Sequence, residues 1–370
     1  MPVLLMSLLL HLYIGWRLAP HLPVAGATAL AGVLLLSVLL IPAAFLGRRS
    51  RQRVVADRWT WAGMLALGGF SMLLVLTLLR DALLLLAWPF GAATAGLQNA
   101  SAAAVPLLAA LAMLAGLVGA RRTARVRHVE VPIDGLPAAL HGFTIAQITD
   151  IHVGPTVKAP YVQAIVDAVN ALRADAVAVT GDLVDGRVQD LHGDVAPLAG
   201  LRSRHGTFFV TGNHEYYSGA VEWIALLGTL GVRVLTNEHV VLEHDGARLV
   251  MAGVADHSAH HFEPAHRSDA PGAIAGAPAD AALRVLLAHQ PRSAEAAADA
   301  GFDVQLSGHT HGGQFWPWNL FVPLQQPYTA GLHRLRALWV YTSRGTGYWG
   351  PPLRLGAPSE ITRLRFVTAA

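Results

Sequence analysis

Four long apolar runs in the first 120 residues of this chain restrict its fold more than any other feature. Each run approaches or exceeds the roughly 20 apolar residues that a helix needs to cross a bilayer. A soluble core rarely requires four such runs in succession, so we expect transmembrane helices rather than buried core helices. Their predicted limits are Pro2 to Ala19, Pro23 to Gly47, Trp59 to Leu79 and Ser101 to Ala120.

The composition supports a division of the chain into two domains. Of its 370 residues, 53% are hydrophobic and only 14% are charged, whereas roughly 25% charged residues are usual in soluble proteins. The apolar excess lies in residues 1–120, which we expect to form the membrane part. Residues 121–370 have the composition of an ordinary globular domain that is long enough to bury a core. The chain has no cysteine, which excludes disulfides and thiolate metal sites.

Two features of the apolar part leave alternatives open. The first run contains His11 and Arg17, and it is also compatible with a signal peptide, although a second run follows at once without an obvious small-residue cleavage site. Arg80 and Asp81 stand next to each other near the end of the third run. They mark either the edge of the membrane or a functional polar site within it.

Arginine clusters predict the orientation in the membrane. One cluster lies between the second and third runs and another follows the fourth run, whereas residues 88–100 carry no charge. Positive loops stay in the cytoplasm, so we expect the C-terminal domain on the cytoplasmic side of a bacterial inner membrane. The formal charge of +3 forms no basic stripe, and nucleic-acid binding is not indicated. The arginines are Arg48, Arg49, Arg51, Arg53 and Arg58 in the first cluster, and Arg121, Arg122, Arg125 and Arg127 in the second.

Beyond about Val126 the apolar runs become short, rich in Val, Ile and Phe, and bounded by Gly, Asp and Asn, as is typical of strands. Strands alternate with helices in the first half, which indicates a layered α/β domain. The predicted strands are Phe143–Thr149, Ala176–Thr180, Thr207–Thr211, Val232–Leu235, Arg248–Ala252, Arg284–Ala288, Asp303–Leu306, Trp339–Thr342 and Ile361–Phe366. The predicted helices are Pro160–Leu172, Ala220–Leu230 and Ser293–Ala300, and Asp256–Asp280 is expected to be a long loop.

Polar side chains follow five of these strands within about three residues: Asp150, Asp182, Asn213, His289 and His309. The carboxyl ends of strands in such domains converge on one crevice. Carboxylate and imidazole ligands together suit Mn, Fe, Zn or similar ions. Two adjacent ions of this kind activate water and hold a phosphate for in-line attack. The pattern therefore predicts metal-assisted cleavage of a phosphate ester.

The same segments resemble the calcineurin-like metallophosphoesterase superfamily. The matching motifs are DIH at Asp150–His152, GDLVD at Gly181–Asp185, GNHE at Gly212–Glu215, AHQP around His289 and GHTHGGQ at Gly308–Gln314. The later SRGTG and PSEI segments are similar to the membrane-attached, YaeI/YkuE-like subgroup, and to an animal transmembrane protein with a metallophosphoesterase domain. The resemblance covers about residues 126–368. It implies a two-sheet β-sandwich flanked by helices, placed after the bundle of about four transmembrane helices.

The resemblance also implies two divalent metal ions and a set of roles. The first ion would be held by Asp150, His152, Asp182 and His311, and the second by Asp182, Asn213, His289 and His309. Asp182 would bridge the two ions and thus take part in catalysis. His214, one residue after Asn213, is placed to give a proton to the departing oxygen.

Several residues keep two interpretations. Asp185 either supports the site from behind its ligands or caps the next turn, and Glu215 either orients His214 or faces solvent. Arg344 contacts the substrate phosphate or forms a structural salt bridge. Asp256 matches a recurring family position without a role that we can derive. Four loop histidines either form a third metal site or belong to a solvated loop, which we favour: His257, His260, His261 and His266.

The expected substrate is a phosphorylated small molecule or a lipid. An aromatic loop at Phe315–Phe321, with Trp316 and Trp318, follows the last metal motif, and Tyr348 and Trp349 lie in another loop. Because Trp favours membrane interfaces, these loops are expected either to admit a lipid-linked substrate or to pack in the core. The resemblance points to a UDP-2,3-diacylglucosamine-type hydrolase of lipid A synthesis. The alternatives are a phosphatase or nucleotide phosphodiesterase with a soluble substrate, and a non-catalytic membrane sensor.

Overall fold

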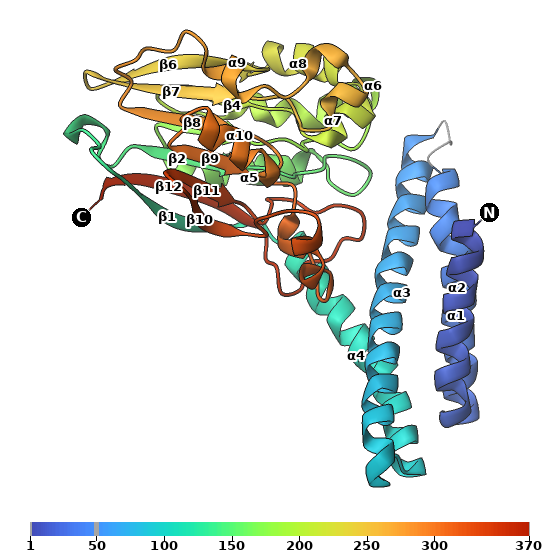
Figure 1. Ribbon diagram of the computed structural model, residues 1–370. Helices are drawn as coiled ribbons and strands as arrows, with labels where there is room; N and C mark the ends of the chain where they lie inside the picture. Colours follow the sequence, from blue (N-terminus) through green and yellow to red (C-terminus); the bar gives the residue numbers. More distant parts are fainter. Residues whose placement is uncertain (1, 48–51, 370) are drawn as a thin grey trace. The chain divides into compact units, whose positions relative to one another are not determined.

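The computed structural model of the chain describes residues 2–47 and 52–369, which form two compact units (Figure 1). The helical unit extends to Arg121 and also includes Gly350–Leu355. The second unit comprises Arg122–Trp349 and the residues from Gly356 onward. Nothing in the sequence sets Gly350–Leu355 apart from the residues on either side of it.

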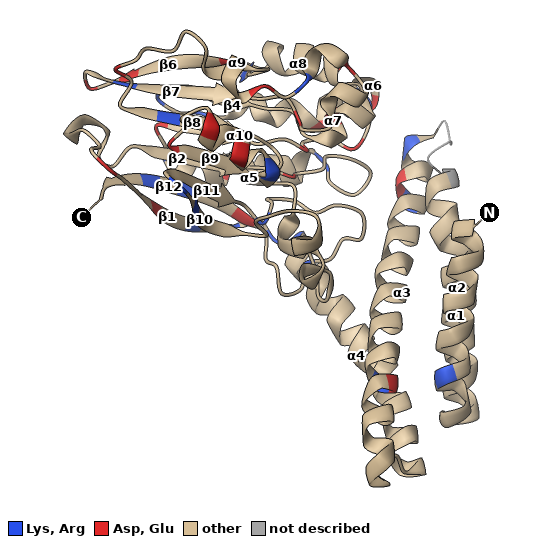
Figure 2. Cartoon of the chain, viewed as in Figure 1, with Lys and Arg blue, Asp and Glu red and all other residues tan. Residues whose placement is uncertain are grey.

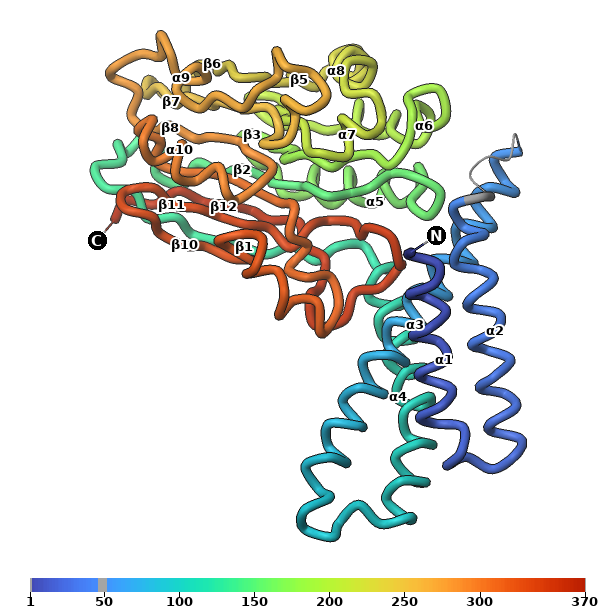
Figure 3. Tube along the Cα trace, turned by 45° about the vertical axis from the view of Figure 1, so that its right-hand side comes forward, coloured from blue at the N-terminus to red at the C-terminus, as the bar shows by residue number. Residues whose placement is uncertain are grey.

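The helical unit contains the four expected helices, each long and apolar enough to cross a membrane. Two of them are longer than the apolar runs predicted, because α3 has 35 residues and α4 has 27. Both helices continue past the turn between α1 and α2 (Figure 3). Of the arginines used to predict orientation, Arg48, Arg49 and Arg51 lie outside the described residues. The helices are α1 Pro2–Leu18, α2 Val24–Gly47, α3 Arg53–Ala87 and α4 Ala95–Arg121.

Charged residues are sparse along these helices (Figure 2), and one network contains the buried Arg80 and the partly buried Asp81. The Arg80 guanidinium lies 3.1 Å from Oδ1 of Asp81 and donates to Oγ of Ser101 at 3.0 Å. Asp81 also accepts hydrogen bonds from Nε of Arg17 at 2.7 Å and from the Tyr13 hydroxyl at 2.6 Å. These bonds join α1, α3 and α4, and each charged group has a partner of opposite charge. The helix therefore continues through Arg80 and Asp81 instead of ending at them.

Gly350–Leu355 packs against α3 and α4 within the helical unit. The amide of Arg354 donates to the carbonyl of Gly116 at 2.8 Å. The Leu353 side chain lies so close to Gly68 that a Cβ placed there would approach it to 2.7 Å. Glycine allows this approach because it has no side chain.

The second unit is built from two six-stranded sheets, which appear as two layers in Figures 1 and 3. The strand orders are β1-β12-β2-β3-β4-β5 and β10-β11-β9-β8-β7-β6. The first sheet contains β1 Arg125–Ile133, β2 Thr144–Ile148, β3 Ala176–Val179, β4 Thr207–Phe209, β5 Val232–Val234 and β12 Glu360–Thr368. The second contains β6 Glu238–His244, β7 Ala247–Gly253, β8 Leu283–Leu287, β9 Val304–Ser307, β10 Gly331–Leu335 and β11 Leu338–Thr342.

The main hydrophobic core draws buried side chains from both sheets, among them Ile145, Phe208, Met251, Leu306 and Phe366. A second core lies where helices pack against the β6–β11 sheet. This arrangement confirms the expected two-sheet sandwich flanked by helices. The helices of the unit are α5 Ala159–Ala171, α6 Val188–Val195, α7 Asn213–Ser218, α8 Ala220–Thr229, α9 Ala270–Ile274 and α10 Ala294–Asp299.

In the second unit every predicted strand is present within two residues of its predicted limits, and every predicted helix within one. Three strands were not predicted, namely β1, β6 and β10, and each of them lies at the edge of a sheet. The expectation of a loop at Asp256–Asp280 was wrong in part. That segment contains α9, whose start is capped by the Asp269 side chain, which accepts a hydrogen bond from the amide of Gly272.

Candidate metal centre

Five polar turns meet where strands of both sheets end. Asp150 follows β2, Asp182 follows β3 and Asn213 follows β4, whereas His289 follows β8 and His309 follows β9. These strands run parallel to their neighbours within each sheet, so their carboxyl ends share an edge. The backbone amide of His309 donates to the Asp150 carboxylate at 3.0 Å. This bond joins a turn of one sheet to a turn of the other.

The first group of facing side chains consists of Asp150, His152 and His311, all of them buried. The Nε2 atoms of His152 and His311 lie 3.0 Å apart, and Nε2 of His311 lies 3.4 Å from Oδ1 of Asp150. Two imidazole nitrogens at this distance require a proton or a cation between their lone pairs. One carboxylate and two imidazoles therefore converge on one position.

The second group consists of Asp182, His289 and His309. Nε2 of His289 lies 3.2 Å from Oδ2 of Asp182 and 3.2 Å from Nδ1 of His309. The same Asp182 oxygen lies 3.9 Å from Nε2 of His152, which belongs to the first group. Asp182 is thus located between the two groups, where a bridging carboxylate is expected.

Asn213 contributes a buried polar atom that the protein leaves unsatisfied. Among the described residues, none forms a hydrogen bond with its side-chain oxygen Oδ1. Such an atom costs about 1–3 kcal/mol when no partner is present. The preceding Gly212 approaches Asp182 so closely that a Cβ there would collide with the Asp182 carboxylate. Asn213 is therefore held beside the second group, where a cation would satisfy its oxygen.

Asp185 joins two histidines from behind. Its Oδ1 atom lies 3.0 Å from Nδ1 of His152 and 2.6 Å from Nδ1 of His214. If both nitrogens donate to this oxygen, each ring presents Nε2 on its other side. Nε2 of His214 lies 4.0 Å from Oδ2 of Asp182. Of the two positions that the sequence allowed for Asp185, this is the supporting one.

Glu215 occupies neither of the positions that the sequence suggested. It is fully buried, and its carboxylate accepts hydrogen bonds from backbone amides instead of orienting His214. Burial, followed by the nearby charge of Asp182, raises the pKa of Glu215 to about 7. Glu215 therefore holds the turn after β3 against the start of α7. The four donors are Gly212 at 2.6 Å, Leu183 at 2.8 Å, Asp182 at 3.0 Å and Val184 at 3.3 Å.

Left-handed backbone conformations concentrate at the expected ligands. The φ angle is 54° for Asp150, 54° for His152, 50° for Asp182, 71° for His309 and 51° for His311. Among the described residues other than glycine, only ten have a positive φ. A residue held in this region costs roughly 1–3 kcal/mol and tends to occur at functional sites. The turns thus direct their side chains into the centre at the expense of backbone strain.

Burial and charge together shift the pKa values in the centre. Burial raises the pKa of Asp150, and burial followed by the charge of His289 lowers that of His309 to about 4. Burial opposes the shifts of Asp182 and His289, but their mutual attraction outweighs it. The pKa of Asp182 is therefore lowered well below its usual range and that of His289 is raised well above it. Burial also opposes the shift of His214, whose hydrogen bond to Asp185 raises its pKa to about 9.

The donor set fits divalent metal ions. Carboxylate, imidazole and carboxamide ligands without thiolate are suited to Mn, Fe, Zn or similar ions. The nitrogen pairs face each other, and the Asn213 oxygen has no described partner. A cation in each group would satisfy all these atoms at once.

The residues expected to bind substrate lie in two different settings. Arg344 pairs with Glu360 at 3.6 Å and packs beside Gly312, so it forms the structural salt bridge that the sequence left open. Trp316 and Trp318 are 38% and 45% exposed on the loop after the last metal motif. They do not pack in the core, which was the alternative for this loop.

The loop histidines and Asp256 have partners of their own. His266 lies 2.9 Å from the Tyr216 hydroxyl. Asp256 is buried and accepts hydrogen bonds from Ser258 and Gln290. Within the described part of the chain, the groups able to hold a metal ion include none of the four loop histidines. The solvated-loop interpretation is the one that agrees with this.

Two aromatic neighbours of His214 were not predicted as its contacts, although Trp349 had been singled out as a loop residue. The ring of Tyr217 lies 5.2 Å from the His214 ring and that of Trp349 lies 5.6 Å from it, measured between centroids. Tyr217 stands three residues after His214, which is a signal that helical spacing offers. Trp349 is distant in sequence, and only the fold reveals this contact.

Comparisons with known proteins agree with this geometry. Residues 143–313 match the calcineurin-like phosphoesterase family. A transmembrane protein with a metallophosphoesterase domain from Bos taurus is 40% identical over 319 residues, covering 80% of this chain and 71% of that protein. Its namesake from Danio rerio is 38% identical over 266 residues, covering 70% of this chain and 61% of that protein.

A bacterial relative confirms the expected subgroup. The uncharacterized metallophosphoesterase YkuE of Bacillus subtilis is 28% identical over 235 residues, covering 61% of this chain and 80% of that protein. Family match, animal relatives and bacterial relative all point to the same chemistry, which the clustered Asp and His side chains are able to support. This chain therefore belongs to the calcineurin-like phosphoesterase family, and it is a metal-dependent phosphoester hydrolase with candidate transmembrane helices.

Proposed function

We propose that this chain is a membrane-anchored phosphoesterase that uses two divalent metal ions to hydrolyse a phosphodiester or pyrophosphate bond. Asp182 lies between the two groups of ligands and would bridge the ions. The remaining ligands of the first ion are Asp150, His152 and His311, and those of the second are Asn213, His289 and His309.

One observation carries this proposal. The Nε2 atoms of His152 and His311 face each other at 3.0 Å, and a second nitrogen pair, His289 and His309, is 3.2 Å apart. Asp182 Oδ2 lies 3.2 Å from the second pair and 3.9 Å from His152. Acceptor atoms gathered in this way repel one another unless a proton or a cation lies between them. Two positions on either side of one carboxylate support a pair of ions more than a single ion.

The residues around the ions have separate tasks in this mechanism. When bound, a pair of cations lowers the pKa of a water molecule and offsets the charge of the phosphate. Asp185 accepts the Nδ1 proton of His214, so that Nε2 is free to hold a proton for the departing oxygen. The pKa of His214, raised to about 9, keeps that proton in place near neutral pH. The backbone amide of His214 donates to Asp182 at 2.9 Å, which ties the acid to the bridging ligand.

The substrate that we propose is lipid-linked. The helical unit supports a location in the membrane, and the exposed aromatic loop carries Trp316, Trp318 and Phe321, with Phe321 52% exposed. Exposed aromatic side chains of this kind suit a membrane interface. A UDP-2,3-diacylglucosamine-type molecule of the lipid A pathway has both the pyrophosphate and the acyl chains that such a site would require.

We further propose that the catalytic unit faces the cytoplasm of a bacterial inner membrane. Arg53 and Arg58 stand at the start of α3, and Arg121 and Arg122 at the end of α4. The turn between α3 and α4 carries no charged residue. The positive-inside rule then assigns both arginine clusters to the cytoplasmic side. Protease accessibility of the second unit in sealed inverted and right-side-out vesicles tests this orientation.

Elemental analysis of the purified full-length chain tests the metal proposal. We expect two divalent ions per chain, and fewer when Asp182 is replaced by Asn, because the bridging charge is lost. Asp303→Asn is the control, since Asp303 is a partly buried carboxylate that accepts a hydrogen bond from the amide of Arg284. One ion or none in the wild-type protein, or an unchanged metal content in Asp182→Asn, would contradict the proposal.

A substrate screen tests the choice of a lipid-linked phosphoester. The detergent-solubilised protein is assayed with bis-p-nitrophenyl phosphate, nucleotide diphospholipids and phosphatidyl lipids. We expect turnover of the lipid-linked substrates to decline when Trp316 and Trp318 are replaced by Ala, with turnover of the soluble diester unchanged. Equal use of both classes, unaffected by these substitutions, would favour a soluble substrate. Bound metal without turnover of any substrate would favour a non-catalytic sensor.

A further inference from the structure

Three half-exposed aromatic rings form a row along His214, which we call the aromatic row: Phe262, Tyr217 and Trp349. The His214 ring lies 5.2 Å from Tyr217 and 5.6 Å from Trp349, and Tyr217 lies 5.4 Å from Phe262, between centroids. Their exposed fractions are 52% for Phe262, 59% for Tyr217 and 54% for Trp349. Large rings left in solvent beside a polar functional group indicate a binding surface.

Two rings of the row are carried on backbone that is hydrogen-bonded in place. The Gln314 carboxamide donates to the Trp349 carbonyl and accepts from the Trp349 amide, both at 2.8 Å. Gln314 itself has a positive φ of 57°, directly after the last metal motif. Tyr217 lies on α7 between the rings of Phe262 and His214. Rings fixed in this way bind a partner with little loss of conformational entropy.

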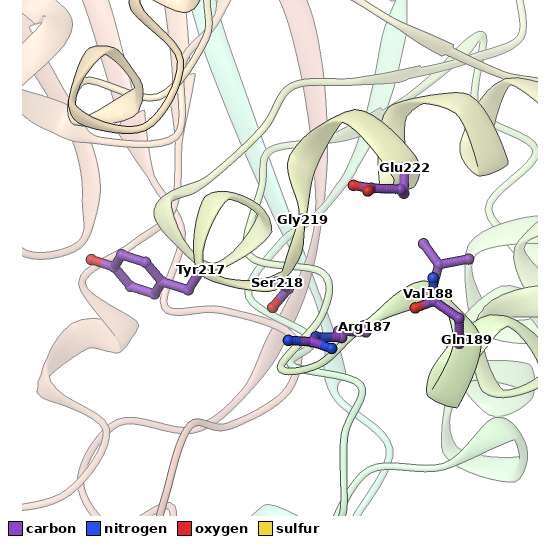
Figure 4. A pocket seen from close by; sticks show the side chains of 7 residues that line it. All are labelled: Arg187, Val188, Gln189, Tyr217, Ser218, Gly219 and Glu222. Atoms are coloured by element: carbon purple, nitrogen blue, oxygen red, sulfur yellow. The ribbon is translucent and has the colours of Figure 1, made fainter.

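A polar cavity of about 370 Å³ adjoins the row at Tyr217 (Figure 4). Arg187 and Glu222 supply both signs of charge, and Ser218 supplies a hydroxyl. Among the described residues, none forms an ion pair with the Arg187 guanidinium. Figure 4 shows the Tyr217 ring pointing away from the other labelled side chains that line the cavity. An acyl chain is poorly suited to such a lining, whereas sugar hydroxyls or a second phosphate would find partners there.

We infer that the aromatic row stacks on a planar aromatic group of the substrate, a nucleobase, while the cavity at Arg187 receives the sugar or a second phosphate of the same nucleotide. This inference rests on the proposed function and deepens it, because it assigns the nucleotide end of the substrate to Tyr217 and Trp349. Every base has a π face, so such a row binds bases without strong sequence preference. His214 stands between the two rings, and a base on either ring is therefore close to the phosphate at the metal centre.

Two ligands isolate the contribution of the base: adenosine 5′-monophosphate and ribose 5-phosphate, which share the phosphate and the sugar. Their dissociation constants are measured by calorimetry on the metal-loaded full-length protein in detergent. Stacking contributes about 1–3 kcal/mol per base, so we expect the nucleotide to bind about tenfold to a hundredfold tighter. Equal affinity of the two ligands for the wild-type protein would overturn the inference without any variant.

Substitutions test whether Tyr217 and Trp349 cause the tighter binding of the nucleotide. In the double variant Tyr217→Leu/Trp349→Leu, we expect the ratio of the two affinities, nucleotide to ribose 5-phosphate, to approach one. The affinity for ribose 5-phosphate should stay unchanged, which would show that the metal centre is intact. Tyr217→Phe keeps the ring and is expected to keep the ratio, as is Val221→Ala, an exposed apolar position on α8 outside the row. A wild-type ratio in the double variant would refute the role of these rings.

The same protein separates this inference from the function on which it rests. If the metal-loaded chain hydrolyses no phosphoester, the proposed function fails and the inference fails with it. If hydrolysis occurs but the base adds no affinity, only the inference fails. Hydrolysis together with a ratio that disappears on removal of both rings supports both.

Discussion

In the helical unit the buried guanidinium of Arg80 faces the carboxylate of Asp81 at 3.1 Å, whereas in the second unit Nε2 of His152 faces Nε2 of His311 at 3.0 Å. The first contact joins opposite charges and is complete within the protein. The second joins two groups that both present lone pairs, and it is incomplete without a proton or a cation. Buried polar groups in the helical unit therefore stabilise helix packing, whereas those in the second unit are arranged to bind a cation.

Backbone conformation differs between the two units in the same way. The residues around Arg80 and Asp81 are regular α-helix, in which every backbone group is satisfied locally. Asp150, Asp182 and His309 instead have left-handed φ angles at turns. Strain of this kind persists only where the surrounding structure imposes it. Five of the seven proposed ligands thus lie on strained backbone, whereas the polar groups that hold the helices together lie on relaxed backbone.

Removal of metal should break the second unit and spare the first, and this is the largest effect that we expect. Chelation should abolish phosphoester hydrolysis, because the water and the phosphate lose the charge that activates them. It should also lower the free energy of unfolding of the catalytic unit. The expected loss is about 4 kcal/mol for each ion whose free concentration before chelation was a thousand times its dissociation constant. Turnover measures the loss of hydrolysis, and thermal unfolding measures the loss of stability. Each is recorded before chelation, after chelation and after the ion has been restored. Unchanged turnover in the metal-free protein would contradict the view that the second unit needs cations whereas the helical unit does not.

His214→Ala should slow hydrolysis of a substrate with a poor leaving group by about 10²- to 10⁴-fold. The metal content should remain intact, because the His214 ring bonds to Asp185 and packs beside the His152 ring without being one of the proposed ligands. Steady-state rates with leaving groups of increasing pKa measure the effect, which should grow with that pKa. His192→Ala removes a histidine that bonds only to its own helix and serves as the control. A normal rate with poor leaving groups would remove His214 from the role of acid.

Asp81→Asn should lower the stability of the helical unit, by about 3 kcal/mol, because it leaves Arg80 and Arg17 without their anionic partner. Thermal or denaturant unfolding in detergent micelles measures the loss. The double replacement Arg80→Leu/Asp81→Leu should cost less than the single one, since no buried charge is left unpaired. Equal stability of Asp81→Asn and the wild-type protein would show that the network is not needed for packing.

The smallest effect that we expect is a change of stability with pH at His205, far from any metal ligand. Its Nε2 atom lies 3.0 Å from Nδ1 of His244, and burial, followed by the His244 charge, lowers its pKa from 6.5. The unfolded chain therefore binds this proton more tightly than the folded one. Stability should be unaffected above pH 6.5 and decline as the pH falls from 6.5 toward the lower folded value.

His205→Gln should reduce this decline. The difference in unfolding temperature between pH 7.5 and pH 5.5 should be smaller in this variant than in the wild-type protein, at constant metal content. His192→Gln, at an exposed helical position, is the control. An identical decline in His205→Gln and the wild-type protein would show that the pair does not respond to protons in this range.

The predicted strands and the missed strands show how far local patterns reach. The central strand β3 is buried on both faces, so it appears in the sequence as a continuous apolar run. The edge strand β1 is exposed at five of its nine positions and carries charged or polar residues at four of them, and its sequence alone does not distinguish it from a linker. Edge strands depend on a partner that the sequence does not identify.

The sequence by itself determined the order of apolar runs and strands, and the types of ligand that follow each strand. These features are local, because turn chemistry and hydrophobic periodicity act over a few residues. Only the tertiary structure decided that Glu215 fixes the Asp182 turn, that Gly350–Leu355 belongs with the helices, and that Trp349 reaches His214. Those contacts join segments that are distant along the chain or depend on which groups become buried. These contacts form only when the sheets and the helices of each unit pack, and no local sequence pattern encodes that packing.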